Sequence, residues 1–288
     1  MEIILGLTAA LGWGGGDFLA GQLSRRLGSF RTLFFAQIIG ILALGVYIAV
    51  TGEYVTLTRV PAEAIIVAFV AALLNMLGAY CLYRAFEIGL MAVVSPICAS
   101  YGALTAILAF FSGERLPAIR VIGVAAAVIG VLLTASLLTL FNPDVLHQRS
   151  LRRGIGWALA GALLYGVVFW VFGFAVTPYL GGILPVFLNR STTFVVLFVV
   201  SLLTGASLAV PRKHEIAPVL TIGVLDTIAY VALLSGSVAG AVSIVTVLSS
   251  LYTTVTVVLA AFLLHERLHP SQWIGVGLIL SGIVLVGM

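Results

Sequence analysis

Residues 113–130 read GERLPAIRVIGVAAAVIG, and residues 265–282 read HERLHPSQWIGVGLILSG. The two stretches share Glu-Arg-Leu, Ile-Gly-Val and a final glycine, each at the same offset of 152 residues (266 − 114 = 152). Apolar sequences match by chance more often than most, but a charged pair and two glycines in register are hard to obtain that way. The chain therefore contains an internal repeat.

The repeat extends towards the N-terminal part of each half. At offsets of 152 or 151 residues, Trp13 aligns with Tyr165, Gln37 with Asn189, and Asn75 with Asp226. The repeat predicts a first half over residues 1–140, a linker over 141–153 and a second half over 154–288.

The composition indicates a membrane protein. Hydrophobic residues make up 62% of the 288 positions and charged residues 8%, whereas a soluble domain carries about 25% charged residues. A surface this apolar is stable in lipid but not in water. The basic residues stand singly or in pairs between apolar runs, so they are read as topology signals, and no nucleic acid is expected as a partner.

Ten runs are long enough to cross a bilayer, which needs about 20 mostly apolar residues. Barrel strands would be about 10 residues long with alternating polarity, so these runs are predicted to be helices. They cover 3–23, 30–51, 62–84, 90–112, 117–139, 154–176, 182–203, 215–236, 240–263 and 269–287.

The predicted fold class is therefore an all-α integral membrane protein with ten transmembrane helices in two five-helix repeats. Because five is odd, the two repeats enter the membrane from opposite sides and are inverted relative to each other. Inverted repeats are typical of secondary transporters, whose substrate site lies near the membrane midplane between the repeats.

This pattern of ten helices in two halves resembles the drug/metabolite transporter superfamily, EamA type. The resemblance is carried by Glu114-Arg115-Leu116 and Glu266-Arg267-Leu268, each before a Gly-rich run, and by Trp13-Gly14. Arg190 resembles an arginine often found in the second helix of a half, whereas Tyr252-Thr253 stands where the family commonly has proline. The resemblance covers nearly the whole chain and implies a multi-pass transporter of a bacterial-type inner membrane, without specifying its substrate.

Basic residues in alternate connections predict the orientation. The side that faces the first connection carries ten basic residues, whereas the other side carries three: Arg59, Arg115 and Arg120. The positive-inside rule makes the first side cytoplasmic and places both termini outside. The family resemblance usually implies termini inside, and we follow the charge count. A reporter active only in the cytoplasm would show activity when fused at Met288 if this orientation is wrong.

Four sites place polar or ionisable residues within the predicted spans: Asp17, Asn75, Asp226 and Asn189-Arg190. A charge at the bilayer centre costs about 2.5–3.5 kcal/mol, so such residues normally face a cavity or a partner. Asp17 and Asp226 are candidates for carrying a proton if transport is proton-coupled. The alternative for Asp226 is an ion pair with Arg190 that links the seventh and eighth spans.

The ninth span carries a polar stripe of Ser249, Tyr252, Thr253 and Thr256 at helical spacing. Such a stripe either hydrogen-bonds to neighbouring helices or lines a wet cavity. We expect a central cavity lined from helices one, three, four, six, eight and nine, which include the helices the family resemblance associates with a pore. The residues expected to contact the substrate are Trp13, Asn75, Ser100, Tyr101, Tyr165, Phe169, Tyr230, Ser249, Tyr252 and Thr253.

The recurring acidic residues Glu114 and Glu266 stand in short polar connections. A carboxylate at the positive N-terminal end of a helix is stabilising, so each is expected to cap the helix that follows it.

These observations predict a secondary active transporter that exports small metabolites by alternating access. Amphipathic or aromatic amino acids are the first substrate class to consider. A passive facilitator or channel for small solutes and a multidrug-type cation exporter are the alternatives. An intramembrane enzyme would need a nucleophile with its base, or a metal site. The sequence has no such pattern and no zinc-like spacing of Cys and His, so no enzyme, metal or cofactor is expected. The expected partners are a small-molecule substrate and the lipid bilayer, with the chain as a monomer or weak homodimer.

Overall fold

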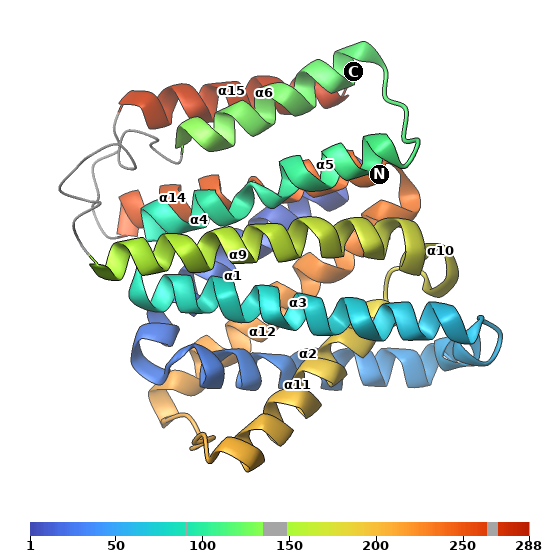
Figure 1. The fold of residues 1–288 in the computed structure, drawn as a ribbon, viewed down its shortest axis with the longest axis vertical. Coiled ribbons are helices and arrows are strands. Elements are labelled where there is room, and N and C mark those ends of the chain that lie inside the picture. Colours follow the sequence, from blue (N-terminus) through green and yellow to red (C-terminus); the bar gives the residue numbers. More distant parts are fainter. Residues whose placement is uncertain (90, 135–148, 264–269, 288) are drawn as a thin grey trace.

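The computed structural model describes residues 1–89, 91–134, 149–263 and 270–287, and all regular structure in these ranges is helical (Figure 1). The first half contains α1 (Glu2–Leu27), α2 (Ser29–Thr51), the short helix η1 (Glu53–Thr58), α3 (Ala62–Ile88), α4 (Met91–Ala99), α5 (Tyr101–Phe111) and α6 (Ala118–Thr134). The second half contains α9 (Arg149–Val171), the π-helical turn η2 (Phe172–Val176), α10 (Thr177–Leu180), α11 (Leu184–Thr204), α12 (Lys213–Ala239), α13 (Val242–Ser249), α14 (Tyr252–Leu263) and α15 (Pro270–Gly287).

Helix lies within each of the ten predicted ranges, but several boundaries differ. The helix α9 begins at Arg149, so the last five residues of the predicted linker are helical, and the sixth predicted span continues through η2 and α10 to Leu180. Residues 141–148 of the linker and Glu266-Arg267-Leu268 lie outside the described ranges. Among the described residues, seven helical segments are long and apolar enough to cross a membrane. The count of ten spans stays a prediction.

The predicted fourth and ninth spans are each divided into two helices. The first break falls at Ser100, between α4 and α5, and the second at Ser250-Leu251, between α13 and α14. The hydroxyl of Ser100 donates to the carbonyl of Ile97, and that of Ser250 to the carbonyl of Val247, both at 2.7 Å. Such hydroxyls compete with the backbone ladder and bend helices. The ninth span is therefore broken without the proline that the family resemblance would place there.

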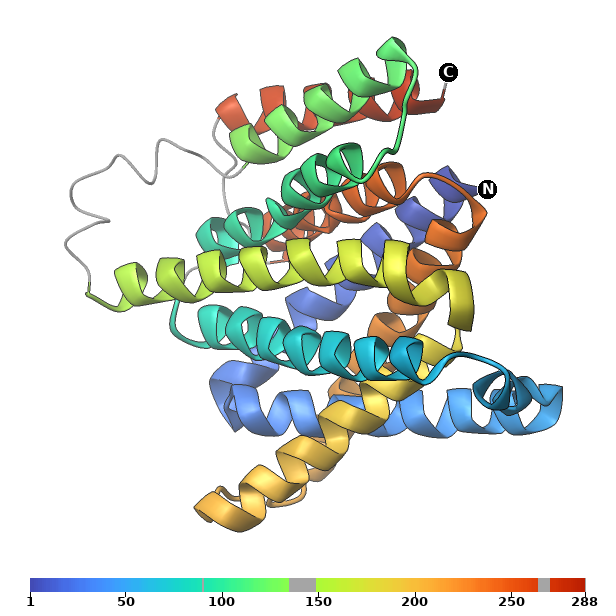
Figure 2. The same cartoon turned by 45° about the vertical axis from the view of Figure 1, so that its right-hand side comes forward.

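The helices run back and forth along the bundle (Figure 1). Figure 2 shows the N-terminus and the end of α15 on the same side, which we call the terminal end. The α1–α2, α3–α4 and α11–α12 connections lie at the opposite end, which we call the basic end. Helix α1 starts at the terminal end and α9 starts at the basic end. The first helices of the two halves thus run in opposite directions.

The contacts between helices occur in matched sets. Helix α1 packs against α12, and its counterpart α9 packs against α3. In the same way α1 packs on α13 and α14, whereas α9 packs on α4 and α5. Helix α2 contacts α11 and α12, and α11 contacts α2 and α3. Each half therefore contributes equivalent surfaces to the contact between the halves.

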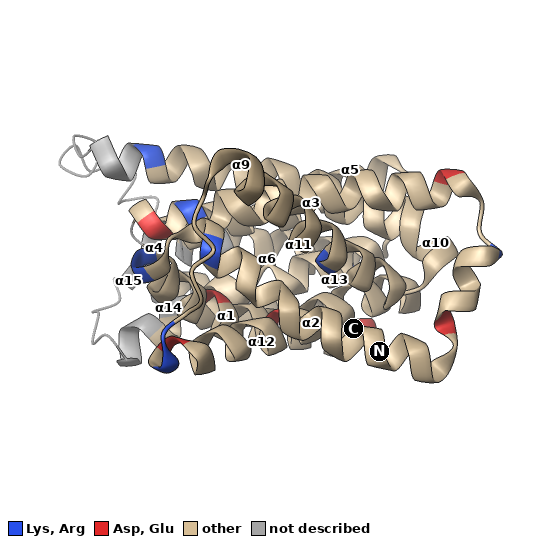
Figure 3. Ribbon diagram, turned by 90° about the horizontal axis from the view of Figure 1, so that it is seen from below, with Lys and Arg blue, Asp and Glu red and all other residues tan. Residues whose placement is uncertain are grey.

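The outer surface of the bundle is apolar along its length and charged at its ends. Large hydrophobic side chains point outwards, including Leu42 (60% exposed), Leu163 (62%) and Leu203 (80%). Figure 3 shows most of the lysine and arginine positions gathered at one end of the bundle, which is the basic end. An exposed apolar belt of this size is unfavourable in water and suits a lipid environment.

Helices α6 and α15 form a close pair at one side of the bundle (Figure 1). A Cβ atom added to Gly123 would lie 2.8 Å from the backbone nitrogen of Val286 and 2.9 Å from the carbonyl oxygen of Gly282. A Cβ added to Gly282 would lie 2.7 Å from the carbonyl oxygen of Gly123. The two backbones therefore touch at Gly123 and Gly282, and a larger residue at either position would clash with the backbone of the other helix.

We expect Gly123→Val to destabilise the α6–α15 pair by about 1–3 kcal/mol. The backbone of α15 would have to move away from α6, and its packing against α6 would be lost. Thermal unfolding of the purified protein in detergent micelles measures this loss. Gly277→Val is the matched control, since no atom lies within 4 Å of its added Cβ. Equal unfolding temperatures for the two variants would show that the close approach at Gly123 does not stabilise the fold.

Candidate functional site

A small cavity of about 40 Å³ lies near the middle of the bundle and is lined by residues of both halves. Along α2 and α3 it extends towards the basic end, because its lining residues on α2 lie in the first half of that helix and those on α3 in the second half. Its volume is well below the range of about 300–1,000 Å³ that is typical of small-molecule sites, so a bound solute requires the lining side chains to move apart. The lining residues are Trp13, Asp17, Leu33, Gln37, Asn75, Ala79, Leu82, Tyr83, Tyr101, Tyr165, Phe169, Asn189, Arg190, Thr193, Asp226, Tyr230 and Tyr252.

One wall of the cavity is a continuous group of aromatic rings. Phe169 stacks on Trp13 with ring centroids 5.7 Å apart and on Tyr165 at 5.2 Å. Tyr101 meets the edge of Phe169 at 5.0 Å and stacks on Tyr252 at 6.2 Å. These rings come from both halves, and Tyr101 and Tyr252 are the first residues after the breaks in the fourth and ninth spans. The breaks thus bring two tyrosines face to face at the centre of the molecule.

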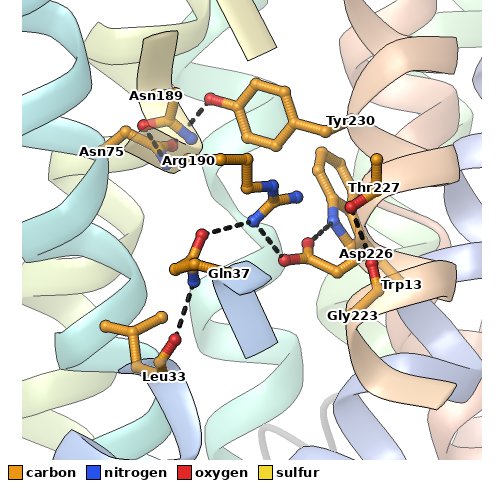
Figure 4. Close-up of polar contacts among 10 residues, drawn as sticks. All are labelled: Trp13, Leu33, Gln37, Asn75, Asn189, Arg190, Gly223, Asp226, Thr227 and Tyr230. Carbon is orange, nitrogen blue, oxygen red and sulfur yellow. Dashed lines mark hydrogen bonds and ion pairs between the residues drawn. The ribbon is translucent and has the colours of Figure 1, made fainter. Parts of the chain in front are cut away.

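A polar network of the cavity adjoins this wall at Trp13 (Figure 4). The guanidinium Nη1 of Arg190 donates to Asp226 Oδ2 at 2.6 Å and to Gln37 Oε1 at 3.1 Å. The indole nitrogen of Trp13 donates to the second carboxylate oxygen of Asp226 at 2.8 Å. The ion pair that the sequence left open is therefore present, and it joins α11 to α12 while Trp13 ties the pair to α1. Both oxygens of Asp226 are occupied by donors.

A second polar group occupies the positions that the repeat makes equivalent to Asp226 and Gln37. Asn75 donates to Asn189 Oδ1 at 3.2 Å and accepts from the hydroxyl of Tyr230 at 2.8 Å. Asn75 aligns with Asp226 in the repeat, and Asn189 aligns with Gln37. The Asn75–Asn189 pair joins two amides directly, whereas in the equivalent Gln37–Asp226 pair the side chain of Arg190 lies between the amide and the carboxylate. Arg190 makes the two sides of the cavity unequal.

A model of the EamA-like transporter family matches the chain twice, over residues 1–136 and 152–288. The chain belongs to the EamA-like transporter family. A solved crystal structure of a protein aligns with 99% of this chain and 95% of its own, with a TM-score of 0.73 and 19% sequence identity. At this identity the likeness shows the fold alone. No curated protein matches the sequence.

The protein is thus a multi-pass membrane transporter of the EamA type, and the cavity is its candidate substrate site. Seven of the ten residues expected to contact substrate line this cavity: Trp13, Asn75, Tyr101, Tyr165, Phe169, Tyr230 and Tyr252. Asp17, Asp226 and Arg190 line it as well. The carboxylate of Asp17 is 7% exposed and has no hydrogen bond or ion pair to any residue in the described ranges. Of the two acidic residues in the cavity, Asp17 is therefore the unpaired one.

Ser100, Ser249 and Thr253 do not line the cavity of this EamA-like transporter. Ser100 bonds to its own helix, as described above, and Thr253 contacts the hydroxyl of Ser95 at 3.2 Å. The hydroxyl of Ser249 lies 3.0 Å from the hydroxyl of Tyr101, and this hydrogen bond helps to fix the position of the tyrosine ring. Thr256 reaches the carbonyl of Gly14 at 3.2 Å. The polar stripe of the ninth span therefore bonds to neighbouring helices, with only Tyr252 reaching the cavity.

Several lining residues were absent from the predicted contact set. On α3, Ala79, Leu82 and Tyr83 follow Asn75 at i+4, i+7 and i+8, and on α11 Thr193 follows Asn189 at i+4. Helical spacing from the polar residues could have identified them, because residues three or four apart share a face. Leu33 and Gln37 on α2 share a face by the same rule, but the second helix was not expected to reach the cavity.

At the terminal end of the bundle, two carboxylates contact the start of α13. Glu2 accepts hydrogen bonds from the backbone nitrogen of Ala241 at 2.9 Å and from Arg120 at 3.0 Å. Glu114 accepts from the backbone nitrogen of Ser243 at 3.3 Å and from its hydroxyl. The expectation that Glu114 caps the helix following it, α6, is wrong. It caps α13 in the other half, where the positive end of the helix lies closer to it.

Proposed function

We propose that this EamA-like transporter is a secondary active exporter of small amphipathic metabolites, with amino acids as the first substrate class. The observation that carries this proposal is the central cavity, which combines an aromatic wall with buried amide, guanidinium and carboxylate groups. A mostly apolar pocket with a few convergent polar groups is the usual form of a small-molecule site. The lipid bilayer and a small solute are then its partners.

Alternating access between two inverted repeats is the proposed mechanism. It is supported by the opposite directions of α1 and α9 and by the matched contacts between the halves. If the halves are structurally equivalent, exchanging their arrangements gives a second state of similar energy that opens to the other side. The cavity extends towards the basic end, and Glu2 and Glu114 connect elements of the two halves at the terminal end. With the basic end in the cytoplasm, this state is suited to loading a substrate for export.

Proton coupling fits the unpaired carboxylate of Asp17 better than that of Asp226. A group that carries a proton must release and rebind it during the cycle. Asp226 already accepts one hydrogen bond from Trp13 and an ion pair from Arg190. Protonating it would remove the charge on which the ion pair with Arg190 depends, whereas protonating Asp17 breaks no interaction among the described residues.

A multidrug-type cation exporter is the second candidate function. It is favoured by the same unpaired Asp17 beside aromatic rings, because a cation is attracted both to a carboxylate and to the face of a ring. The two candidates differ in the net charge of the substrate. They can therefore be separated with substrates that share a ring but differ in charge.

Transport by purified protein in liposomes tests the function. Vesicles containing the protein are expected to accumulate labelled phenylalanine when a pH gradient is imposed, and one coupled proton supports about tenfold accumulation per pH unit. Protein-free vesicles give the background. Equilibration without accumulation would point instead to a passive facilitator, and uptake of labelled 2-phenylethylamine but not phenylalanine would favour the cation exporter. No protein-dependent flux of either solute would contradict the proposed function.

A further inference from the structure

Arg190 uses only one of its three guanidinium nitrogens. Nη1 makes both of the contacts described above, to Asp226 and Gln37. Nε and Nη2 are buried and have no hydrogen-bond partner among the described residues, and Arg190, which is 3% exposed, lines the cavity. A buried donor without a partner normally costs about 1–3 kcal/mol, and more for a charged group. Two such donors on one side chain indicate a site whose partner is a ligand.

The free nitrogens form the edge of the guanidinium that binds carboxylates best. The Nε–H and Nη2–H bonds of an arginine are parallel and match the two oxygens of a carboxylate in a bidentate pair. The guanidinium carbon lies over the ring of Tyr230, 5.5 Å from its centroid, so an aromatic face lies beside the guanidinium (Figure 4). Asp226 does not use this edge, because its contact with the guanidinium is made through Nη1.

We propose that the Nε and Nη2 edge of Arg190 binds the carboxylate of the transported solute while Nη1 keeps its bond to Asp226. This inference rests on the proposed transport function and specifies its substrate class. Both nitrogens are shielded from water in this structure, so the carboxylate reaches them when cavity side chains shift around the bound solute. Arg190 is then the residue that selects a carboxylate over a neutral or purely cationic solute.

The charges in the cavity further limit the chemical class of the substrate. Arg190 and Asp226 cancel, and Asp17 leaves the cavity with one unbalanced negative charge when it is ionised. A simple carboxylate would add a second negative charge, whereas a zwitterion brings an ammonium group that can offset Asp17. The preferred ligand is therefore an amino acid, with its side chain against the rings of Trp13 and Phe169.

Four probes that share a phenyl ring test this assignment in the unmodified protein. They are L-phenylalanine, L-phenylalaninamide, 3-phenylpropionate and 2-phenylethylamine, with affinity measured by calorimetry in lipid nanodiscs. L-phenylalanine is expected to bind at least about tenfold more tightly than its amide, which keeps the ammonium group and the ring but lacks the carboxylate. Phenylpropionate is expected to fall between the two. An amide that binds as tightly as the acid overturns the assignment, and so does the absence of binding by all four probes.

A matched pair of variants tests the residue itself. Arg190→Lys keeps the charge beside Asp226 but removes the planar edge, so the preference for acid over amide is expected to fall from about tenfold to near onefold. Arg153→Lys makes the same change at an exposed position of α9 and is expected to leave the preference unchanged. If Arg190→Lys folds and keeps the full preference for the acid over the amide, another group binds the carboxylate. If it does not fold, the acid and amide affinities of the unmodified protein still decide the inference.

The outcomes for the inference and for the proposed function are distinguishable. Coupled transport of amine or amide probes without any preference for a carboxylate would leave the transporter function standing and remove the role assigned to Arg190. Tight binding of phenylalanine without transport in liposomes would support the Arg190 site and contradict the secondary active mechanism.

Discussion

Replacing Asp226 with alanine is expected to lower the free energy of unfolding by about 3–5 kcal/mol. The change leaves the guanidinium of Arg190 buried at 3% exposure with Gln37 as its remaining partner. It also removes the acceptor of the Trp13 indole. An uncompensated buried charge destabilises the fold far more than the intact ion pair stabilises it. The measured loss of stability therefore reports the cost of leaving Arg190 unpaired, not the net contribution of the ion pair.

Thermal or denaturant unfolding in detergent micelles measures this effect, with Arg190→Met/Asp226→Leu as the informative partner variant. The double replacement removes both charges and is expected to recover most of the lost stability, because a buried ion pair can often be exchanged for apolar side chains of similar volume. It is not expected to recover substrate binding, since no guanidinium remains. A double variant as unstable as Asp226→Ala would show that the polar geometry, and not charge balance, holds α11 and α12 together.

Replacing Asp17 with asparagine is expected to abolish accumulation driven by a pH gradient without destabilising the fold. Asp17 has no hydrogen bond or ion pair within the described residues, so asparagine removes its charge and breaks no contact. Removing an unpaired buried charge is neutral or stabilising. The roughly tenfold accumulation per pH unit expected of a one-proton exporter should fall to simple equilibration, while exchange of labelled for unlabelled solute continues.

Liposome assays of accumulation and exchange, made on the same preparation, separate these two activities. The equivalent change at the paired site, Asp226→Asn, is the comparison, and it is expected to reduce stability because it weakens the bond to Arg190. Accumulation that persists in Asp17→Asn, and is lost together with its pH dependence in a folded Asp226→Asn, would assign the proton to Asp226. The ion pair with Arg190 would then be part of the transport cycle rather than a fixed link.

The sequence predicted the candidate site best at charged residues, which need a partner or a cavity inside a membrane. Asp226 and Arg190 had to be paired or face a cavity because charge is costly in lipid, and they do both. The aromatic residues Trp13, Tyr165 and Phe169 were found by their alignment and spacing. Hydroxyl side chains were harder to place. Ser249 and Thr253 can satisfy themselves on a neighbouring helix as easily as on a solute, so their spacing did not distinguish the two roles.

The sequence by itself determined the membrane environment, the internal repeat and the charge that must be compensated, because composition and spacing are properties of the chain. Only the tertiary structure decided which partner each polar group takes. It paired Glu114 with α13 rather than α6 and brought Gln37 to the cavity. Within the described part of the chain, it left two nitrogens of Arg190 and the carboxylate of Asp17 without partners. The reason is physical. Hydrogen bonds act over about 3 Å, and which groups come within that distance depends on how helices from opposite halves pack.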